Sequence, residues 1–293
     1  MEPSSAGRAL PTLAYQVVDV FTGAAFAGTP LAVVLDADDL STEALQLLAR
    51  EFALSETAFP MLASDAADYR LRIFTPEVEL PFAGHPSVGA AWVMAQLGRV
   101  APGPVVQSCG AGLLPLEVSA DGGPVTLAGG QPTAGGALDP GPLLAAVGLR
   151  AKDQTGVEPR VCGAGLEWAY LMVTPDAVAR AVPDLPRLPE LEATGVSVFA
   201  WDGARAHARV FAGGVGVAED PATGSAALGL GVYLARTGLL PDGGDYLVEQ
   251  GVEMGRPSLL RCRIEVADGA VVRSTVSGSV VPIARGEIRR PDV

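Results

Sequence analysis

Two short stretches decide the fold: ELPFAGHP at residues 79–86 and EDPATGSA at residues 219–226, which lie 140 positions apart. The match continues without a gap, so that six positions in a 20-residue window are identical, where composition alone would give about two. Upstream it extends to RIF at residues 72–74 and RVF at residues 209–211, after a three-residue difference in loop length. We interpret the two regions as copies of one strand, turn and helix, and predict two similar domains.

Each copy is predicted to place a glycine-containing turn at the N-terminus of a helix of about a dozen residues. Gly98 and Gly238 stand just past the helix ends, where a left-handed backbone is needed. Gly89 and Gly229 lie inside the helices and indicate close packing against the sheet. Free N–H groups and the helix dipole favour an anion, so two facing turns can hold a carboxylate between them. Taken singly, each turn is more often an ordinary helix cap, and the repeat makes that interpretation weaker.

The residues before the first copy predict two strands and a helix. Residues 15–21 and 30–35 have the apolar pattern and length of strands. Residues 42–52 place apolar side chains on one helical face, with Ser41 as the expected N-cap. Residues 69–74 alternate apolar with charged side chains, which is typical of a half-buried strand.

Composition favours an ordinary globular protein. Of 293 residues 49% are hydrophobic, and 33 acidic against 20 basic side chains give a formal charge of −13. Such a charge disfavours nucleic acid as a partner. We find no signal-peptide pattern and no run of the roughly 18 apolar residues that a membrane helix needs, so we expect no membrane partner and a cytoplasmic location.

Metal and nucleotide sites are not predicted. The three cysteines are far apart, and we expect passive, buried thiols. They are Cys109, Cys162 and Cys262. The two histidines, His85 and His207, have no ligand spacing, and His207 is interpreted as a strand residue. Residues 213–216 lack the order of a dinucleotide-binding motif and are interpreted as a loop.

These motifs resemble the phenazine-biosynthesis (PhzF-type) isomerase family, whose fold is that of diaminopimelate epimerase. The resemblance runs from about residue 14 to the C-terminus. Its segments are 19–22 (DVFT), 54–57 (LSET), 72–76 (RIFTP), 80–86 (LPFAGHP), 219–226 (EDPATGSA), 250–251 (QG) and 254–257 (MGRP). It implies an α+β fold of two similar domains, each a curled, barrel-like β-sheet around a central α-helix, with the active site in the cleft between them.

The repeat and the resemblance together suggest domains over residues 13–130 and 131–293. The resemblance further implies that a last strand, at about residues 276–283, crosses back to the first domain, and that the protein forms a homodimer. Related epimerases carry one cysteine in each turn and use the pair as base and acid. Neither residues 81–85 nor residues 221–225 contain a cysteine, so a two-thiol mechanism is excluded at these positions.

Glu56 is the expected proton carrier. It lies in residues 54–59, a segment that Pro60 is expected to end. An isomerase without a cofactor must remove a proton from carbon and return one, which needs a group whose pKa is tuned by burial. Glu56 matches the catalytic glutamate that the family carries in its LSET motif. The spacing alone favours a solvated glutamate after a helix, and the resemblance reverses that preference.

His85 and Asp220 are expected on opposite sides of the same cleft, because each flanks one of the repeated turns. By resemblance they join Glu56 as catalytic residues. Four further residues are expected to bind or polarise the substrate or a developing oxyanion. They are Gly84, Thr223, Gly224 and Ser225. From the sequence alone, a single histidine is more often structural than catalytic.

The leading hypothesis is therefore a cofactor-independent isomerase or epimerase that moves a proton on a small carboxylate by carboxylate acid–base catalysis. The alternative is a non-catalytic small-molecule binding protein that keeps the same cleft. A purely structural protein gives no reason for the three titratable residues to occur together. The identity of the substrate stays open.

Overall fold

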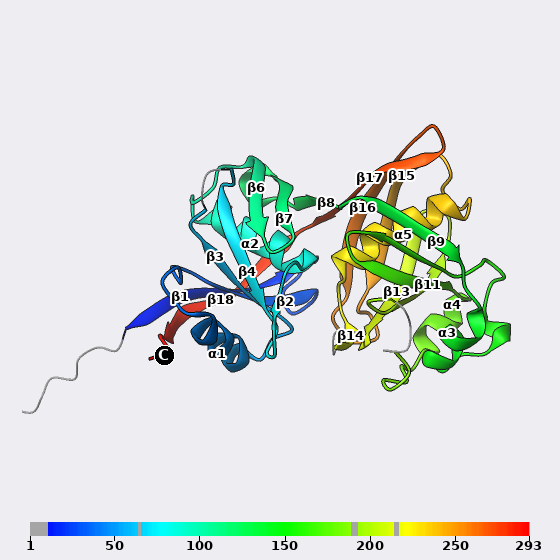
Figure 1. The fold of residues 1–293 in the computed structure, drawn as a ribbon, viewed down its shortest axis with the longest axis horizontal. Coiled ribbons are helices and arrows are strands. Elements are labelled where there is room, and N and C mark those ends of the chain that lie inside the picture. Colours follow the sequence, from blue (N-terminus) through cyan, green and yellow to red (C-terminus); the bar gives the residue numbers. More distant parts are fainter. Residues whose placement is uncertain (1–10, 64–65, 189–192, 214–216, 293) are drawn as a thin grey trace, which may run out of the picture.

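A computed structural model describes residues 11–63, 66–188, 193–213 and 217–292. Within them the strands form one continuous curled sheet, which folds into two lobes (Figure 1). The helices are α1 (Thr42–Phe52), α2 (Gly84–Gln96), α3 (Pro140–Ala146), α4 (Pro175–Arg180) and α5 (Gly224–Arg236). The strands are β1 (Thr12–Val20), β2 (Thr29–Val34), β3 (Thr57–Met61), β4 (Tyr69–Phe74), β5 (Glu79–Leu80), β6 (Gly103–Cys109), β7 (Gly112–Val118), β8 (Val125–Ala128), β9 (Pro132–Ala137), β10 (Arg160–Ala164), β11 (Glu167–Met172), β12 (Val196–Trp201), β13 (Arg205–Ala212), β14 (Val217–Asp220), β15 (Gly244–Gln250), β16 (Ser258–Ala267), β17 (Ala270–Gly278) and β18 (Val280–Arg289).

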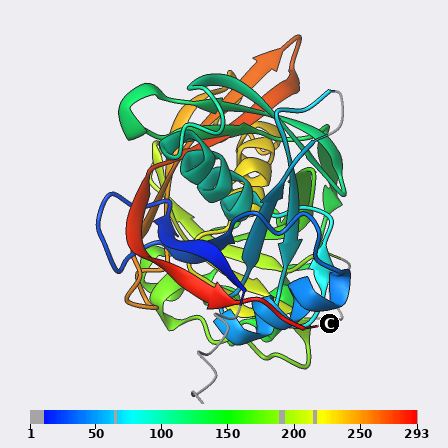
Figure 2. The same ribbon diagram turned by 90° about the vertical axis from the view of Figure 1, so that its left-hand side faces the viewer.

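Each lobe wraps its part of the sheet around one buried helix, which confirms the predicted fold class. Helix α2 contacts β1 to β4, β7, β8 and β18, whereas α5 contacts β9 to β11, β16 and β17. In Figure 2 the teal α2 lies in front of the yellow α5, with strands around both. Most residues of both helices are buried on every face, as expected for helices that strands surround. By contrast, α1 lies outside the sheet, and Ser41 caps it by accepting the Ala44 N–H at 3.1 Å.

An arginine–glutamate pair appears once in each lobe, which supports the duplication at the level of single side chains. Arg72 donates two hydrogen bonds to Glu79, each of 2.7 Å. Arg209 donates two to Glu219, each of 2.8 Å. Each guanidinium also lies over the phenylalanine two positions later, 5.1 and 5.0 Å from the ring centroid. The predicted repeat is therefore a structural one.

One strand pairing and one crossing of the chain connect the lobes. Strand β17 pairs with β8 through Thr275–Ala128 to Gly278–Val125. The C-terminal strand β18 then pairs antiparallel with β1, from Val280–Val20 to Arg289–Thr12. Residues 276–283, predicted as one strand, thus span the end of β17, a break at Ser279 and the start of β18. The boundary at residue 130 stays a prediction.

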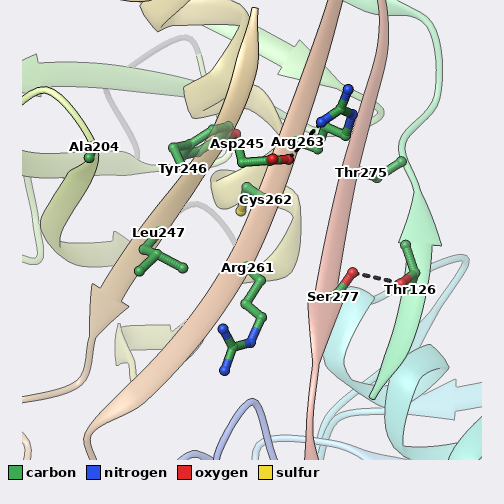
Figure 3. Close-up of a pocket in the computed structure, with 10 residues that line it drawn as sticks. All are labelled: Thr126, Ala204, Asp245, Tyr246, Leu247, Arg261, Cys262, Arg263, Thr275 and Ser277. Atoms are coloured by element: carbon green, nitrogen blue, oxygen red, sulfur yellow. Dashed lines mark hydrogen bonds and ion pairs between the residues drawn. The ribbon is translucent and has the colours of Figure 1, made fainter. Parts of the chain in front are cut away.

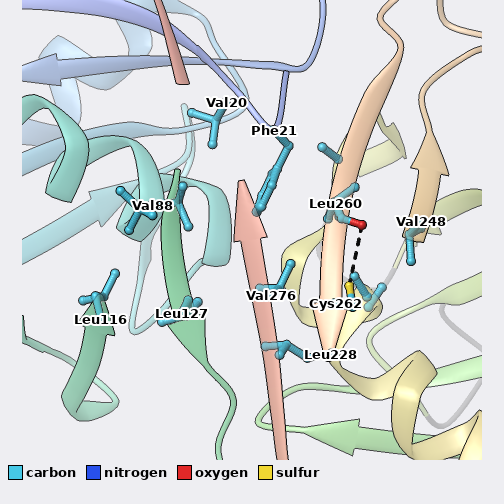
Figure 4. Packing of buried hydrophobic residues seen from close by; sticks show 14 of the residues in the cluster. Val20, Phe21, Val88, Leu116, Leu127, Leu228, Val248, Leu260, Cys262 and Val276 are labelled. Carbon is cyan, nitrogen blue, oxygen red and sulfur yellow. Dashed lines mark hydrogen bonds between the residues drawn. The ribbon is translucent and has the colours of Figure 1, made fainter. Parts of the chain in front are cut away.

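Phe21 joins the two lobes and corrects one predicted boundary. The strand expected over residues 15–21 ends at Val20, because Phe21 has a left-handed backbone with φ of +62°. Its buried ring packs on Gly278 and Gly224, two positions where a side chain would crowd it. Figure 4 shows this ring between Val20 of the first lobe and the strands of the second. One hydrophobic cluster therefore runs through both lobes.

The predicted roles of the helix glycines are confirmed. Gly98 and Gly238 have φ of +67° and +77° just past α2 and α5. A Cβ on Gly89 would lie 2.5 Å from the Leu31 side chain of β2, and one on Gly229 would overlap the Tyr170 hydroxyl of β11. Both interior glycines thus permit close approach to the sheet.

Two other expectations need correction. Pro60 lies inside β3 rather than after it, because β3 pairs with β2 only at Thr57 and Ala58 and its edge is free beyond them, where a missing N–H is tolerated. Cys109 is half-buried at the end of β6, whereas Cys162 and Cys262 are buried as predicted. All three cysteines are free thiols. No helix among the described residues is long and apolar enough to cross a membrane.

Candidate active site

All seven residues predicted for the site line one cavity of about 240 Å³ where the two lobes meet. They are Glu56, Gly84, His85, Asp220, Thr223, Gly224 and Ser225. Apolar side chains from both lobes form the rest of the wall, and sequence reasoning missed them. They include Leu80, Phe82, Leu166, Trp168 and Val217. The cavity therefore has a polar end and an apolar wall.

The N-termini of α2 and α5 face each other across this cavity. A Cβ on Gly84 would lie only 3.4 Å from the Gly224 Cα, so glycine permits the approach. Neither N-cap residue, Ala83 or Thr223, accepts a hydrogen bond from its own helix through its side chain. The first-turn N–H groups of both helices, and the positive ends of both helix dipoles, are therefore directed into the same cavity.

Glu56 reaches the cavity from the segment between α1 and β3. Helix α1 ends because Ala53 adopts a left-handed backbone with φ of +51°, which turns the chain towards the site. Burial raises the pKa of the Glu56 carboxyl, and the neighbouring Ser55 hydroxyl acts in the opposite direction. A carboxyl of this kind can hold or release a proton closer to neutrality than an exposed glutamate.

His85 lies in the first turn of α2, with its Nε2 3.3 Å from Oε2 of Glu56. The two atoms are not aligned for a hydrogen bond, and neither has another partner among the described residues. Burial lowers the pKa of His85 to about 4, although the charge of Asp220 acts in the opposite direction. The imidazole is therefore neutral at neutral pH, with polar atoms free for a ligand.

Asp220 ends β14 on the other side of the cavity. Its Oδ2 accepts the Thr223 hydroxyl at 2.7 Å, and its Oδ1 accepts the Ala222 N–H at 3.4 Å. Burial raises the pKa of Asp220; neighbouring His85 lowers it and Glu56 raises it further. Two buried carboxyl groups that influence each other in this way do not ionise independently.

Two further side chains hold the second turn, and the sequence did not single out either for this role. Gln250 of β15 bonds to the Asp220 carbonyl and to Thr223. Trp168 of β11 donates its indole N–H to Ser225 Oγ at 3.2 Å, so the serine hydroxyl keeps its own hydrogen to donate. Gln250 had appeared only within the QG match, and no local pattern connects Trp168 to the turn.

A larger hollow of about 580 Å³ lies on the outer face of β15 to β17, with Thr126 of β8 at its side (Figure 3). Its ionisable groups include the exposed pair Arg263 and Asp245, with atoms 3.0 Å apart. None of the predicted site residues lines it. We therefore place the candidate active site in the smaller cavity between the lobes.

Other polar groups lie outside this cavity. His207 is a residue of strand β13, as predicted, and its Nε2 is 3.0 Å from Glu253. In the parts of the chain that the structure describes, no group of three or more His, Cys, Asp or Glu side chains is arranged to hold a metal ion. Of the glycine-rich stretch predicted as a loop, residues 214–216 lie outside the described residues.

The duplicated lobes and the site between them define a protein of the epimerase-like fold class. The PhzF-family phenazine biosynthesis protein of Bacillus anthracis has a similar structure, with a TM-score of 0.85 and 24% identity over 95% of this chain and 99% of that one. A hydroxyproline epimerase from Agrobacterium vitis, solved with trans-4-hydroxy-L-proline, has a TM-score of 0.64 and 16% identity over 94% and 92% of the two chains. These likenesses show the fold.

The family model described as phenazine biosynthesis-like protein (PhzC-PhzF) matches residues 18–286, and the chain belongs to this family. It is 37% identical over 281 residues to the trans-2,3-dihydro-3-hydroxyanthranilate isomerase of Pseudomonas aeruginosa, covering 93% of this chain and 98% of that protein. The resemblance found in the motifs is thus confirmed, and the chain is an isomerase.

Proposed function

We propose that the protein is a cofactor-independent isomerase that moves a proton between carbon atoms of a small carboxylate. The observation that carries this proposal is the convergence of two buried carboxyl groups and a neutral histidine on one cavity, beside two uncapped helix N-termini. Sites that shift the pKa values of several adjacent groups are typical of acid–base catalysis.

The substrate carboxylate binds at the facing turns. The N–H groups around Gly84 and Gly224 are the donors, and the Ser225 hydroxyl supplies another. The hydrocarbon part of the substrate lies against the apolar wall. In this position the turns also stabilise negative charge that develops on the substrate during proton transfer.

Glu56 carries the proton. As a carboxylate it takes a proton from a carbon atom activated by the substrate's carboxylate or by a neighbouring double bond, and the electron pair of that C–H bond moves into the conjugated system. As a carboxylic acid it then gives a proton to a different carbon. Substrate and product have the same atoms and oxidation state, so the step requires no redox partner. His85 and Asp220 orient and polarise the substrate.

The first acid to test is the one named for the Pseudomonas aeruginosa relative, trans-2,3-dihydro-3-hydroxyanthranilate. The small cavity volume supports a ligand of this size class. Other small unsaturated carboxylates are the next acids to test. The wall residues come from many separate loops and strands, so no single motif identifies the substrate.

Replacement of Glu56 by glutamine tests the role of the carboxyl. Wild-type protein and Glu56→Gln are incubated with the acid in D2O, and deuterium on carbon is followed by NMR. We expect incorporation by the wild type and a loss of about 10²- to 10⁴-fold in the variant, because an amide cannot exchange the proton.

Glu51→Gln is the matched control, since Glu51 is exposed on the neighbouring helix α1. It should exchange deuterium at the wild-type rate. Equal incorporation by all three proteins would remove Glu56 from the proposed role. Thermal protection by the acid without any exchange would favour a binding protein instead. The homodimer and the cytoplasmic location stay predictions, and sedimentation of the purified chain tests the first.

A further inference from the structure

Each lobe has a buried glutamine that bonds to the N-terminal end of its central helix, and the two glutamines lie on equivalent strands. Gln107 belongs to β6, which runs parallel to β4, and Gln250 belongs to β15, which runs parallel to β13. Both side chains are almost completely buried, at 0% and 1% exposure. A buried amide must satisfy its donors and acceptor internally, so its partners are informative.

In the first lobe the hydrogen bonds end on the backbone. The Tyr69 hydroxyl donates to Gln107 Oε1 at 2.8 Å, and Gln107 Nε2 donates to Ser87 Oγ at 3.0 Å. Ser87 in turn donates to the Ala83 carbonyl at 2.9 Å. This chain of bonds reaches no ionisable group of the site.

In the second lobe the bonds of the buried glutamine lead to a carboxyl group. Gln250 Nε2 donates to the Asp220 carbonyl at 2.7 Å and to Thr223 Oγ1 at 3.0 Å, while Gln250 Oε1 accepts the Thr223 N–H at 3.2 Å. A carbonyl only accepts and a backbone N–H only donates, so the orientation of this amide is fixed.

The next bond runs from Thr223 to Asp220. The Thr223 hydroxyl accepts from Gln250 with one lone pair and donates its single hydrogen to Asp220 Oδ2, 2.7 Å away. Oδ2 is the acceptor of this bond, because the hydrogen between the two oxygens belongs to Thr223.

We propose that Gln250 is a positioning residue that acts through Thr223: it keeps Asp220 Oδ2 as an acceptor and leaves Oδ1 as the oxygen of Asp220 that carries a proton. The inference rests on the proposed function in that it assigns Asp220 to the same site. It changes the role of Thr223 from a substrate contact to a link between Gln250 and Asp220.

The same bonds keep the α5 N-terminus open. A threonine at an N-cap normally accepts a hydrogen bond from the first turn of its own helix. Here the Thr223 hydroxyl is turned to Asp220 and Gln250, and it makes no such bond. The free N–H groups of α5 thus remain available to a substrate carboxylate.

The ionisation of Asp220 also depends on charged side chains from other elements. Glu56, from the segment before β3, and His85 of α2 both influence its ionisation, as stated above. Arg209 of β13 is already paired with Glu219 on the adjacent β14. Removing the Thr223 bond leaves these charges in place and withdraws a donor that favours ionised Asp220. The pKa of Asp220 should then rise.

The test is titration of the Asp220 carboxyl in the whole protein by ¹³C NMR with labelled aspartate, the resonance being assigned with Asp220→Asn. We expect Gln250→Leu and Thr223→Val each to move the Asp220 midpoint upwards by about one pH unit. Thr223→Ser, which keeps the hydroxyl, should restore it. The matching limb of the pH profile for deuterium exchange should move by the same amount.

Gln107→Leu is the matched control, because it removes the buried glutamine on the equivalent strand of the first lobe. It should leave the Asp220 midpoint at the wild-type value, whereas a general effect of burying leucine would move it too. If Gln250→Leu does not fold, Thr223→Val decides, since valine has nearly the size and shape of threonine. An unmoved midpoint in folded Thr223→Val overturns the inference.

The two proposals fail separately. A wild-type protein that exchanges no acid but shows the expected Asp220 shifts contradicts the proposed function and supports the positioning role. An active enzyme with an unshifted Asp220 contradicts the positioning role alone.

Discussion

His85 makes the stability of the protein dependent on pH. Its folded-state pKa of about 4 lies below the usual value near 6.5. When pH falls through 6.5, the unfolded chain binds a proton that the folded chain does not, so this histidine's contribution to stability declines until the pH reaches about 4. The full effect is about 3 kcal/mol.

The measurement is the free energy of unfolding in denaturant at several pH values between about 7 and 4, for wild type and His85→Gln. Glutamine does not titrate, so the variant should lack this decline in the free energy of unfolding. Its stability relative to the wild type should therefore increase as pH falls. Glu56 and Asp220 act in the opposite sense, because their raised pKa values make protonation favour the folded state. Both are present in the variant, where the loss of His85 raises the pKa of Asp220 further and adds to the variant's gain at low pH. A constant difference across the range, or an imidazole NMR midpoint near 6.5, would contradict the burial argument.

Site residues with a local sequence signal could be predicted. Glu56, His85 and Asp220 each lie in a short motif that identifies them as site residues. The repeat then relates the two turns to each other. Trp168 and Gln250 could not be assigned, because their function depends on a hydrogen bond to a turn 57 and 27 residues away. Only the folded sheet brings these strands beneath the turn.

Gly229 shows how a helix element is fitted to its sheet. Tyr170 donates its hydroxyl hydrogen to the Ala226 carbonyl of α5 at 2.7 Å, in the space that a side chain at residue 229 would fill. Alanine gains about 1 kcal/mol of helix propensity. The overlap outweighs that gain, so Gly229→Ala should lower the free energy of unfolding by about 2 kcal/mol. Denaturant unfolding measures the difference.

Two controls separate overlap from a general effect of the new methyl group. Tyr170→Phe combined with Gly229→Ala should recover part of the loss, because the obstructing oxygen is gone. The methyl group added by Gly89→Ala in α2 would contact only side-chain methyl groups, including those of Leu31 and Val20. This variant should therefore lose less free energy of unfolding than Gly229→Ala. Equal losses at both glycines, with no recovery in the double variant, would rule out this explanation.

Elements were predictable where the local pattern agreed with the tertiary structure. Helix α1 has the predicted bounds, including its cap, because its apolar face and Ser41 act locally. Phe21 could not be predicted to leave its strand, since the left-handed turn is fixed by packing against the other lobe. Pro60 was misplaced because a free sheet edge is a property of the whole sheet.

At the scale of the molecule, Asp19 and Arg256 connect the lobes through an ion pair with atoms 2.6 Å apart, in which the Asp19 carboxylate is buried and the Arg256 guanidinium is half-buried. Arg256 also donates to the Gly28 and Ala27 carbonyls, at 2.7 and 3.0 Å. Arg256→Met leaves the Asp19 carboxylate buried, with the Phe26 N–H as its remaining hydrogen-bond partner among the described residues. We expect a loss of about 3 kcal/mol in the free energy of unfolding.

Arg263→Met is the control, because Arg263 forms an exposed pair with Asp245 on the outer face of β15 and β16. It should cost less than about 1 kcal/mol. The double variant Asp19→Asn with Arg256→Met should lose less than the sum of the two single variants. Additive losses would mean that the two side chains stabilise the lobes independently of each other.

The two lobes could be predicted from the repeat at an offset of 140 residues. Their shared core could not, because it depends on Phe21 and on the pairing of β17 with β8. Charge and composition limited the possible functions without pointing to any contact between the lobes.

Strand β18 has a consequence for biosynthesis. One edge of β1 stays bare until its partner arrives, and that partner runs from residue 280 to residue 289. At about 5 to 20 residues per second, the nascent chain exposes this edge for roughly 15 to 50 seconds on the ribosome. Bare strand edges attract other chains. The first lobe is thus translated early but completes its sheet only when β18 has been synthesised. During this interval the unpaired edge of β1 is the part of the chain that a chaperone would shield.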